Sequence, residues 1–251
     1  MPDVGSGVSV ASLYRFDPVH DVQGLRDAVE ASCAGRSLRG TVLLAPEGVN
    51  ATLAGRRADL DYVIGRHFPG VDVKWSSAAP GNPVFRRLRV RARPEIVTFD
   101  FPLSATTPVG KHVSPTAWTA LIADPDVLVL DVRNDYESDV GTFKGATRAG
   151  IDSFRDFPDF VTRELGHDRN RPIAMFCTGG IRCEKASAHL LARGFDNVSQ
   201  LDGGILGYFA ETKDADAFEG ECFVFDERVS VTANLEEGGF ELCGNCSRPL
   251  S

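Results

Sequence analysis

The residues with the clearest chemical potential form a short loop that begins with a cysteine. The loop consists of Cys177, Thr178, Gly179, Gly180, Ile181 and Arg182. It follows the apolar stretch 172–176, which is typical of a buried strand, and it precedes a helical pattern over 184–193. Adjacent glycines allow positive φ angles, so backbone N–H groups can turn toward the thiol, and the helix N-terminus carries about half a positive charge. Arg182 adds a fixed cation, so the pattern predicts a depressed pKa and a nucleophilic thiolate at Cys177.

Three more side chains are candidates for accessory roles around this loop. Cys183 follows the loop directly, and it either packs against the sheet or acts as a resolving thiol that captures an oxidised or persulfidated Cys177. Asp131 and Arg133 lie at the end of the apolar stretch 127–132, and we expect them to form a pair that braces the loop. The loop arginine has two possible roles, contact with substrate or support of the turn through its fork of donors.

Strands and helices alternate in the C-terminal half of the chain, which contains this loop. Strands are expected at 127–132, 172–176 and 198–201, and helices at 114–123, 153–165 and 184–193. This order predicts a doubly wound parallel sheet, in which ligands bind at the carboxyl ends of the strands. Asp131 and Cys177 both lie at such ends, so we expect them at one edge of the sheet.

The N-terminal half shows a different order of elements. Strands are expected at 8–16, 41–45, 49–53 and 71–75, and helices at 21–36 and 57–68. The order β-α-β-β-α-β predicts a ferredoxin-like, or acylphosphatase-like, α+β domain. The chain therefore belongs to the α/β class, with this domain preceding the parallel sheet.

A basic segment follows the ferredoxin-like pattern. Over 85–97, arginines alternate with apolar residues, so a strand there would present its guanidinium groups on one face. The candidate RNA-binding residues are Lys74, Arg86, Arg87, Arg89, Arg91 and Arg93. The alternative is a solvated face whose arginines pair with nearby carboxylates. Both interpretations remain open at this point.

The boundaries follow from these patterns. The predicted parts are a ferredoxin-like domain at 1–103, a linker at 104–112, a catalytic domain with the parallel sheet at 113–216 and a C-terminal tail with a CxxC motif at 217–251. The linker contains several proline, serine and threonine residues and has neither helical nor strand periodicity.

Composition excludes several classes of protein. The 251 residues are 43% hydrophobic and 25% charged, a globular balance that suits two domains. A net charge of −8 disfavours general attraction to nucleic acid, so RNA contact requires a local basic patch, and we expect no DNA binding. No apolar run is long enough to span a bilayer, so no membrane partner is expected.

The cysteine pattern and the N-terminal residues bear on the cellular location of the protein and on whether it binds a metal. Six cysteines at irregular spacing do not make a disulfide scaffold, and residues 1–5 lack the pattern of a signal peptide, so a cytoplasmic location is predicted. Cys243 and Cys246 have the spacing of metal ligands, but structural zinc takes four ligands, and we expect no metal site. We see no dinucleotide fingerprint and no 2-His-1-carboxylate cluster, so no bound cofactor is expected.

The motifs together resemble a known family. The rhodanese-like motifs are Leu130-Asp131-Val132-Arg133, Glu137, Gly145-Ala146, the loop from Cys177 to Arg182, and Leu201-Asp202-Gly203-Gly204-Ile205. Rhodanese domains commonly have Gly-His where this chain has Gly141-Thr142. Three further motifs, Ala45-Pro46-Glu47-Gly48-Val49-Asn50-Ala51-Thr52, Glu95-Ile96-Val97-Thr98 and Glu221-Cys222-Phe223-Val224-Phe225-Asp226-Glu227-Arg228, extend the resemblance to the rhodanese-type tRNA uridine hydroxylases.

The resemblance implies an activity. Members of that family carry out oxygen-dependent hydroxylation of the wobble uridine of tRNA at carbon 5, which implies molecular oxygen as co-substrate, the tRNA anticodon stem-loop as partner and Cys177 as the required cysteine. A sulfurtransferase that carries a persulfide on Cys177 is the alternative, but such an enzyme has no evident use for an arginine-rich strand. A third possibility is an RNA-binding adaptor with a vestigial rhodanese fold, and the intact loop argues against it. The sequence leaves the oligomeric state open.

Overall fold

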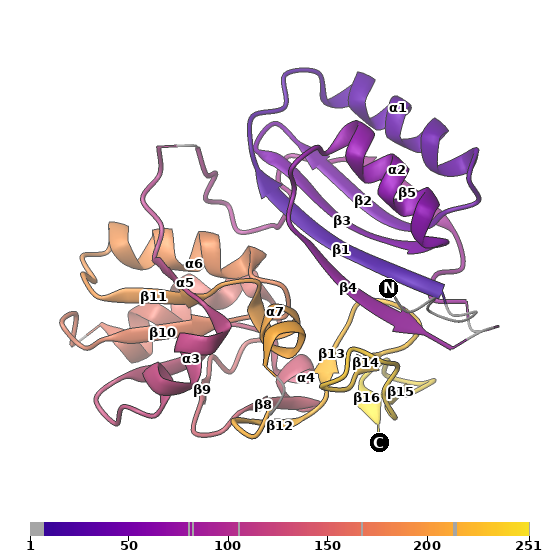
Figure 1. Ribbon diagram of the computed structural model, residues 1–251. Helices are drawn as coiled ribbons and strands as arrows, with labels where there is room; N and C mark the ends of the chain where they lie inside the picture. The colour runs from indigo at the N-terminus through magenta and orange to yellow at the C-terminus, as the bar shows by residue number, and fades with distance from the viewer. Residues whose placement is uncertain are drawn as a thin grey trace.

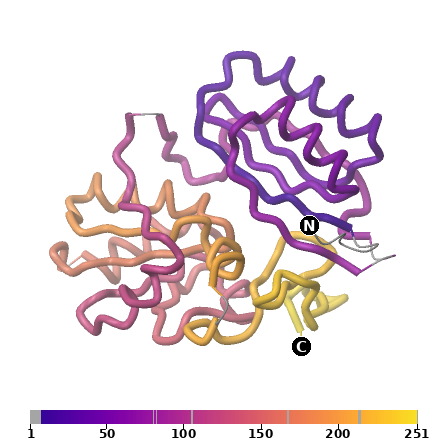
Figure 2. The backbone as a smooth tube through the Cα atoms, in the orientation of Figure 1, coloured from indigo at the N-terminus to yellow at the C-terminus, as the bar shows by residue number. Residues whose placement is uncertain are grey.

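The computed structural model contains two lobes joined by an extended segment, with a small C-terminal tail that lies beside both lobes (Figures 1 and 2). It describes residues 8–79, 81, 83–104, 106–166, 168–212 and 215–250. The N-terminal residues 1–7, which bear on the predicted absence of a signal peptide, lie outside the described residues. No helix in the described part of the chain is long and apolar enough to cross a membrane.

The N-terminal domain is a five-stranded sheet covered by two helices. Its elements are β1 (Val8–Phe16), α1 (Val22–Ala34), β2 (Arg39–Ala45), β3 (Gly48–Gly55), α2 (Arg57–His67), β4 (Val73–Ala78) and β5 (Leu88–Ala92). The strand order is β4-β1-β3-β2-β5. The first four strands are antiparallel to their neighbours, as the ferredoxin-like pattern predicts, and β5 adds a parallel strand beside β2.

The two faces of this sheet have different surroundings. Alternate residues such as Leu13, Ala51 and Val42 form a buried core with α1 and α2. The other face carries small polar side chains, and it points toward the C-terminal lobe (Figure 1). On that face the register places Ser12 beside Thr52, a row that continues across β2 to β5. The domain thus presents an uncovered polar surface to its partner lobe.

The strand that forms in the basic segment is shorter than the predicted strand over 85–97. Only Leu88–Ala92 forms a strand, because prolines at 83 and 94 flank it and lack the N–H that a ladder requires. Within it, Arg89 lies beside Thr41 and Arg91 beside Leu43, so both occupy the uncovered face. Val90 points to the opposite face and packs into the core below α1. The prediction of one long strand over 85–97 was therefore wrong in extent, although the alternation within 88–92 was right.

The C-terminal lobe is built on a parallel sheet of order β6-β11-β10-β7-β9. Its strands are β6 (Lys111–Val113), β7 (Leu128–Asp131), β9 (Thr147–Arg148), β10 (Ile173–Phe176) and β11 (Val198–Leu201). Its helices are α3 (Pro115–Ile122), α4 (Asp135–Ser138), α5 (Phe157–Phe160), α6 (Ile181–Ala192) and α7 (Gly204–Glu211), with short helical turns η1 (Phe154–Asp156) and η2 (Val161–Leu165) beside α5. The parallel sheet confirms the predicted fold class.

Helix α6 starts earlier than the sequence pattern indicates. It begins at Ile181 rather than at residue 184, because Gly180 takes a φ of 100° and turns the chain directly into the helix. Arg182 and Cys183 therefore belong to the first helical turn, and the true loop comprises only Cys177 to Gly180. The expected continuous helix over 153–165 is instead divided between η1, α5 and η2.

The C-terminal tail forms three small antiparallel pairs. Strand β12 (Phe218–Gly220) pairs with β8 (Gly141–Phe143), β13 (Cys222–Phe223) with β14 (Ser230–Val231), and β15 (Glu241–Leu242) with β16 (Pro249–Leu250). The tail runs beside β4 of the N-terminal domain (Figure 1). Arg228 donates to Ser76 Oγ at 2.9 Å and to the carbonyl of Ser77 at 3.1 Å, which ties the tail to that strand.

A buried lysine joins the two lobes directly. Lys185, on α6, has no exposed surface, and its Nζ lies 2.9 Å from Glu47 Oε1 and 2.7 Å from Glu95 Oε1. Glu47 belongs to the turn between β2 and β3, and Glu95 follows β5. Because a charge removed from water needs its partners in place, this cluster fixes the N-terminal domain against the helix that follows the cysteine loop.

Candidate active site

Cys177 stands at the carboxyl end of the central strand β10, where the sequence predicted it. Its Sγ accepts a hydrogen bond from the backbone N–H of Gly180 at 3.2 Å. The side chain has no exposed surface. The first turn of α6 follows at once, so the sulfur lies where backbone donors converge at a helix N-terminus.

The environment of Cys177 favours the thiolate. Burial by itself raises the pKa of the thiol, but the Cys183 side chain, the Arg182 guanidinium and the N–H groups of residues 182 and 183 outweigh it and lower the pKa to about 6. Cys183 shows the opposite behaviour, because burial and the neighbouring Cys177 thiolate raise its pKa well above the usual value. The pair therefore consists of a thiolate at Cys177 and a neutral thiol at Cys183 near pH 7.

Arg182 is held by a carboxylate that the sequence analysis did not assign to the site. Its two terminal nitrogens donate to both carboxylate oxygens of Glu137, at 2.5 and 2.7 Å, and Glu137 has no exposed surface. Thr178 Oγ1 adds a contact of 3.4 Å to the same carboxylate. Although burial opposes the charged form, Glu137 raises the pKa of Arg182. The guanidinium thus supports the loop as a fixed cation, one of the two roles that the sequence left open.

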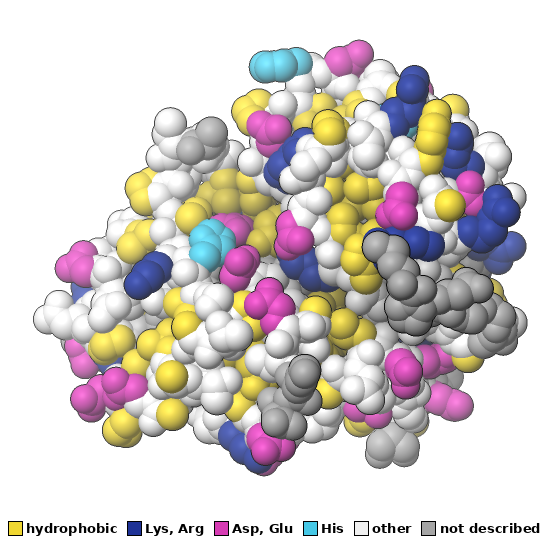
Figure 3. Space-filling model, in the orientation of Figure 1, with side chains coloured by type: hydrophobic (Ala, Val, Ile, Leu, Met, Phe, Trp, Pro, Cys, Tyr) yellow, Lys and Arg dark blue, Asp and Glu magenta, His cyan; other side chains and the backbone are white. Residues whose placement is uncertain are grey.

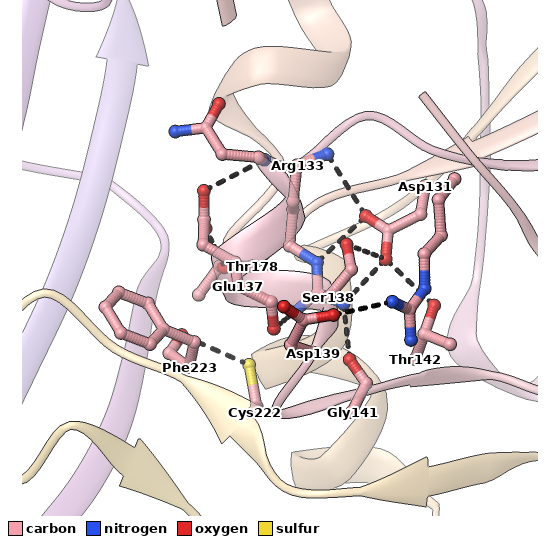
Figure 4. Close-up of polar contacts among 12 residues, drawn as sticks. Asp131, Arg133, Glu137, Ser138, Asp139, Gly141, Thr142, Thr178, Cys222 and Phe223 are labelled. Atoms are coloured by element: carbon pink, nitrogen blue, oxygen red, sulfur yellow. Dashed lines mark hydrogen bonds and ion pairs between the residues drawn. The ribbon is translucent and has the colours of Figure 1, made fainter. Parts of the chain in front are cut away.

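Asp131 and Arg133 form the expected pair, deep in the domain (Figure 4). Arg133 donates to Asp131 Oδ1 at 2.9 Å and Oδ2 at 2.6 Å, and it also donates to the carbonyl of Gly141 at 2.6 Å. Thr142, which stands where related domains commonly have histidine, donates to Asp131 at 2.8 Å. Asp131 and Arg133 are fully buried, so they order the segment that carries Glu137. Neither borders the cavity described below.

The start of α7 is hydrogen-bonded to the backbone of the cysteine loop. The N–H groups of Ile205 and Leu206 donate to the carbonyls of Cys177 and Thr178, both at 3.0 Å. At Gly204, where φ is 63°, a Cβ atom would lie 2.5 Å from the Cys177 carbonyl oxygen. Only glycine permits this close approach, which gives the Gly203-Gly204 motif its structural meaning.

A tyrosine from the N-terminal domain reaches the loop from the other side. Tyr14, on β1, donates to Glu184 Oε1 at 3.0 Å, and its hydroxyl lies against Gly180. Glu184 also contacts His112 Nε2 at 2.9 Å and accepts from Gln200 at 3.2 Å. Burial, followed by the negative charges of Glu184 and Cys177, raises the pKa of Tyr14, so its phenol stays protonated. Sequence analysis missed Tyr14 because only the packing of the two lobes brings it to the loop.

A cavity of about 820 Å³ separates the loop from the uncovered face of the N-terminal sheet. Cys177, Thr178 and Gly179 lie on one side, with Ser12 and Thr52 on the other. This volume falls in the range of about 300–1,000 Å³ typical of small-molecule pockets. On the face shown in Figure 3, hydrophobic side chains gather where the lobes meet, and Lys and Arg side chains lie mainly over the N-terminal domain.

The candidate RNA-binding cations do not form a single ridge. Lys74 lies on β4, at the opposite edge of the sheet from β5, and its Nζ contacts Asp72 at 2.5 Å. Arg86 pairs with Glu227 of the tail at 3.0 Å. The remaining four, Arg87, Arg89, Arg91 and Arg93, are exposed and form no ion pair with another described residue. We call these four residues the arginine edge.

The described residues contain no group of three or more His, Cys, Asp and Glu side chains arranged to hold a metal ion. Within the tail, Cys243 and Cys246 are not buried, and a turn connects them in which the Ser247 N–H donates to the Cys243 carbonyl at 2.9 Å. Nothing in this arrangement adds the two further ligands that tetrahedral zinc requires.

The fold and the loop define a class of protein, a rhodanese-like domain preceded by an acylphosphatase-like domain. Residues 8–96 match the family described as "UPF0176 acylphosphatase like domain", and residues 114–211 match the "Rhodanese-like domain" family. A solved rhodanese-like domain from an Anabaena protein is 23% identical and covers 45% of this chain and 80% of its own, with a TM-score of 0.38.

Full-length relatives narrow the class to one family. A tRNA uridine(34) hydroxylase of Bradyrhizobium diazoefficiens is 48% identical over 94% of this chain and 96% of its own length. A tRNA uridine(34) hydroxylase of Mesorhizobium japonicum is 45% identical over 97% of this chain and 81% of its own. The chain belongs to the tRNA uridine(34) hydroxylase family.

Proposed function

We infer that this chain is a tRNA-modifying oxidoreductase that hydroxylates carbon 5 of the wobble uridine, with Cys177 as its nucleophile. The observation that carries this function is the position of a stabilised thiolate on a cavity between two domains, in a chain whose full-length relatives are tRNA uridine(34) hydroxylases. A cavity of about 820 Å³ has room for a nucleobase with its ribose. Cys177 has no exposed surface, so the base reaches the sulfur only after a local opening of its surroundings.

The first chemical step uses residues that the structure describes. The Cys177 thiolate adds to carbon 6 of uracil, and the electrons of the C5–C6 double bond move to form an enolate across carbon 5 and O4. We assign stabilisation of the enolate to uncharged Tyr14, whose hydroxyl lies against Gly180, and to the N–H groups at the start of α6. Glu137 keeps Arg182 charged beside the sulfur throughout, so the leaving thiolate is stabilised as well.

Oxygen enters in the second step, with molecular oxygen as co-substrate. Carbon 5 attacks dioxygen, one oxygen atom remains on carbon 5, and the other leaves as water. This balance consumes two electrons and two protons, and we assign them to thiols, two of which become one disulfide. Loss of the carbon 5 proton then expels Cys177 as thiolate and restores the ring double bond.

The arginine edge supplies the contact with the anticodon stem-loop. Its four guanidinium groups are exposed and have no acidic partner among the described residues, so their charge is available to phosphates. Arg93 also borders the cavity that Cys177 borders. The wobble base is unpaired in the free anticodon loop, so moving it into the cavity costs little pairing energy. We propose that the reaction takes place in the cytoplasm, and a tRNA substrate supports this location.

The test is a reaction of the purified chain with tRNA that lacks the modification. Oxygen, a thiol reductant and unmodified tRNA are supplied, and the nucleosides are analysed by mass spectrometry. We expect 5-hydroxyuridine to accumulate with wild type and not with Cys177→Ser. Absence of this nucleoside, together with transfer of sulfur from thiosulfate by the same protein, would establish the sulfurtransferase alternative instead.

A further inference from the structure

One exposed aromatic ring borders the cavity and is used by nothing described above. Phe225 is 59% exposed, and the other large exposed hydrophobic side chains in the described chain, Tyr62, Leu242 and Leu250, lie away from this cavity. Phe225 comes from the C-terminal tail, between β13 and β14, whereas Cys177 comes from the parallel sheet. Phe225 therefore offers an exposed apolar ring to the cavity, where an entering ligand can cover it.

The backbone beneath this ring is held firmly. Val224 N–H donates to the carbonyl of Val229 at 2.8 Å, which closes a tight turn. Inside the turn, Asp226 and Arg228 form an ion pair of 2.6 Å whose side chains are each only 1% exposed. The same arginine donates to β4, so the turn is anchored on the N-terminal domain as well. The ring therefore projects from a rigid support.

Two neighbours set the orientation of the ring. Phe223 meets it edge-on, with ring centroids 5.1 Å apart and an interplanar angle of 84°. The Arg182 guanidinium lies 5.7 Å from the Phe225 centroid, and that guanidinium is fixed by Glu137. Arg182 is also the cation that lowers the pKa of Cys177, and the ring and Cys177 border the same cavity.

We propose that Phe225 is the stacking platform for the wobble base that enters the cavity. The inference rests on the proposed function, because it takes the substrate to be an unpaired base of RNA. Single-stranded bases bind to proteins by stacking on aromatic side chains, and a phenyl ring offers a π-face without hydrogen bonds. The ring thus holds the base beside Cys177, and the choice of uracil falls to polar groups elsewhere in the cavity.

The decisive test is a double-mutant cycle in binding, made without oxygen so that no turnover occurs. Dissociation constants are measured for two anticodon stem-loops, one with uridine at position 34 and one with an abasic ribose there. We expect Phe225→Ala to weaken binding of the uridine stem-loop by about 5- to 150-fold and to leave the abasic one unchanged. Equal loss on both RNAs, or no loss on either, would overturn the proposal.

Two further variants separate stacking from simple apolar contact. Phe225→Trp keeps a π-face, so it should retain the affinity for the uridine stem-loop, whereas Phe225→Leu should lose most of it. Retention of affinity by the leucine variant would contradict a stacking role. Tyr62→Ala is the matched control, because Tyr62 is 48% exposed and lies on α2, outside the cavity. It should bind both RNAs like wild type.

Failure of this inference can be told apart from failure of the proposed function. If wild type hydroxylates tRNA but Phe225→Ala does so with unchanged kcat/KM, only the stacking role is lost. If wild type binds the uridine stem-loop and never hydroxylates it, the proposed reaction is wrong, and the binding cycle still decides the role of the ring. The pH midpoint of Cys177 alkylation should be equal in all variants, which confirms that the loop is intact.

Discussion

The arginines around the cysteine loop are buried and paired with carboxylates, whereas those of the arginine edge are exposed. Around the loop, Arg182 is paired with Glu137 and Arg133 with Asp131, and all four side chains are at least nine-tenths buried. Along the arginine edge the guanidinium groups are exposed, and they have no carboxylate partner among the described residues. Both regions are rich in arginine, yet one is a rigid interior and the other an open surface.

The difference shows how burial decides what an arginine does. A buried guanidinium must keep its carboxylate, because separating the two leaves an uncompensated charge, and the pair therefore fixes geometry. An exposed guanidinium pays no such penalty and remains free to contact phosphate. The buried pairs thus fix the geometry around the loop, whereas the charges of the arginine edge stay exposed to solvent. Four predictions test this contrast, from the largest expected effect to the smallest.

The first prediction removes the nucleophile. Cys177→Ser should lower the rate of uridine hydroxylation by about 1,000-fold or more, because a serine hydroxyl is not ionised near neutral pH. Binding of tRNA should change little, since the arginine edge is untouched. Nucleoside mass spectrometry and a binding titration measure the two quantities on the same protein. Hydroxylation at the wild-type rate would move the chemistry away from this loop.

The second prediction breaks a buried pair. Glu137→Ala leaves Arg182 charged and without its partner in the interior, so the free energy of unfolding should fall by about 3–5 kcal/mol. Urea denaturation measures it. The control is Asp61→Ala, which removes a partner of Arg57 from an exposed pair, and it should cost less than about 1 kcal/mol. An equal decrease in the free energy of unfolding in the two variants would contradict the claim that the buried pair contributes more to stability than the exposed pair.

The third prediction concerns pH. Because the pKa of Cys177 is lowered to about 6, its thiolate should be half-formed near pH 6 and nearly complete at pH 7.5. The rate of alkylation by iodoacetamide, followed at this residue by peptide mass spectrometry, should fall about tenfold per pH unit below 6. Cys183→Ala removes one of the groups that lower the pKa, so the midpoint should move upward. A midpoint near 9 in wild type would refute the stabilised thiolate.

The fourth prediction weakens the arginine edge. Arg89→Gln and Arg91→Gln should each weaken tRNA binding a few-fold and reduce the slope of log K against log salt by about 1. Arg56→Gln is the control, because Arg56 is 86% exposed but pairs with Asp59 beside the helices, away from the cavity. Titrations at several salt concentrations measure the slope. An unchanged slope in both edge variants would show that the edge is only a solvated face.

Much of the architecture was predictable from local patterns. The patterns over 8–16 and 114–123 gave a correct strand and a correct helix, because such patterns depend on neighbours in the chain. The helix start at Ile181 was missed, since it depends on the φ of Gly180, which the glycine pair allows but does not require. The length of β5 was also overestimated. The predicted strand over 85–97 included Pro94, whereas β5 ends at Ala92.

The sequence by itself determined the reactive group: a cysteine before two glycines, with an arginine at the following helix, indicates a stabilised thiolate whatever surrounds it. Only the tertiary structure decided which side chains surround the cysteine loop and its arginine. Glu137, Tyr14 and Phe225 come from three separate parts of the chain, and no spacing relates them to Cys177. Long-range packing of the sheet, the N-terminal domain and the tail brings Tyr14 and Phe225 to one cavity and Glu137 to Arg182, and periodicity carries no information about such contacts.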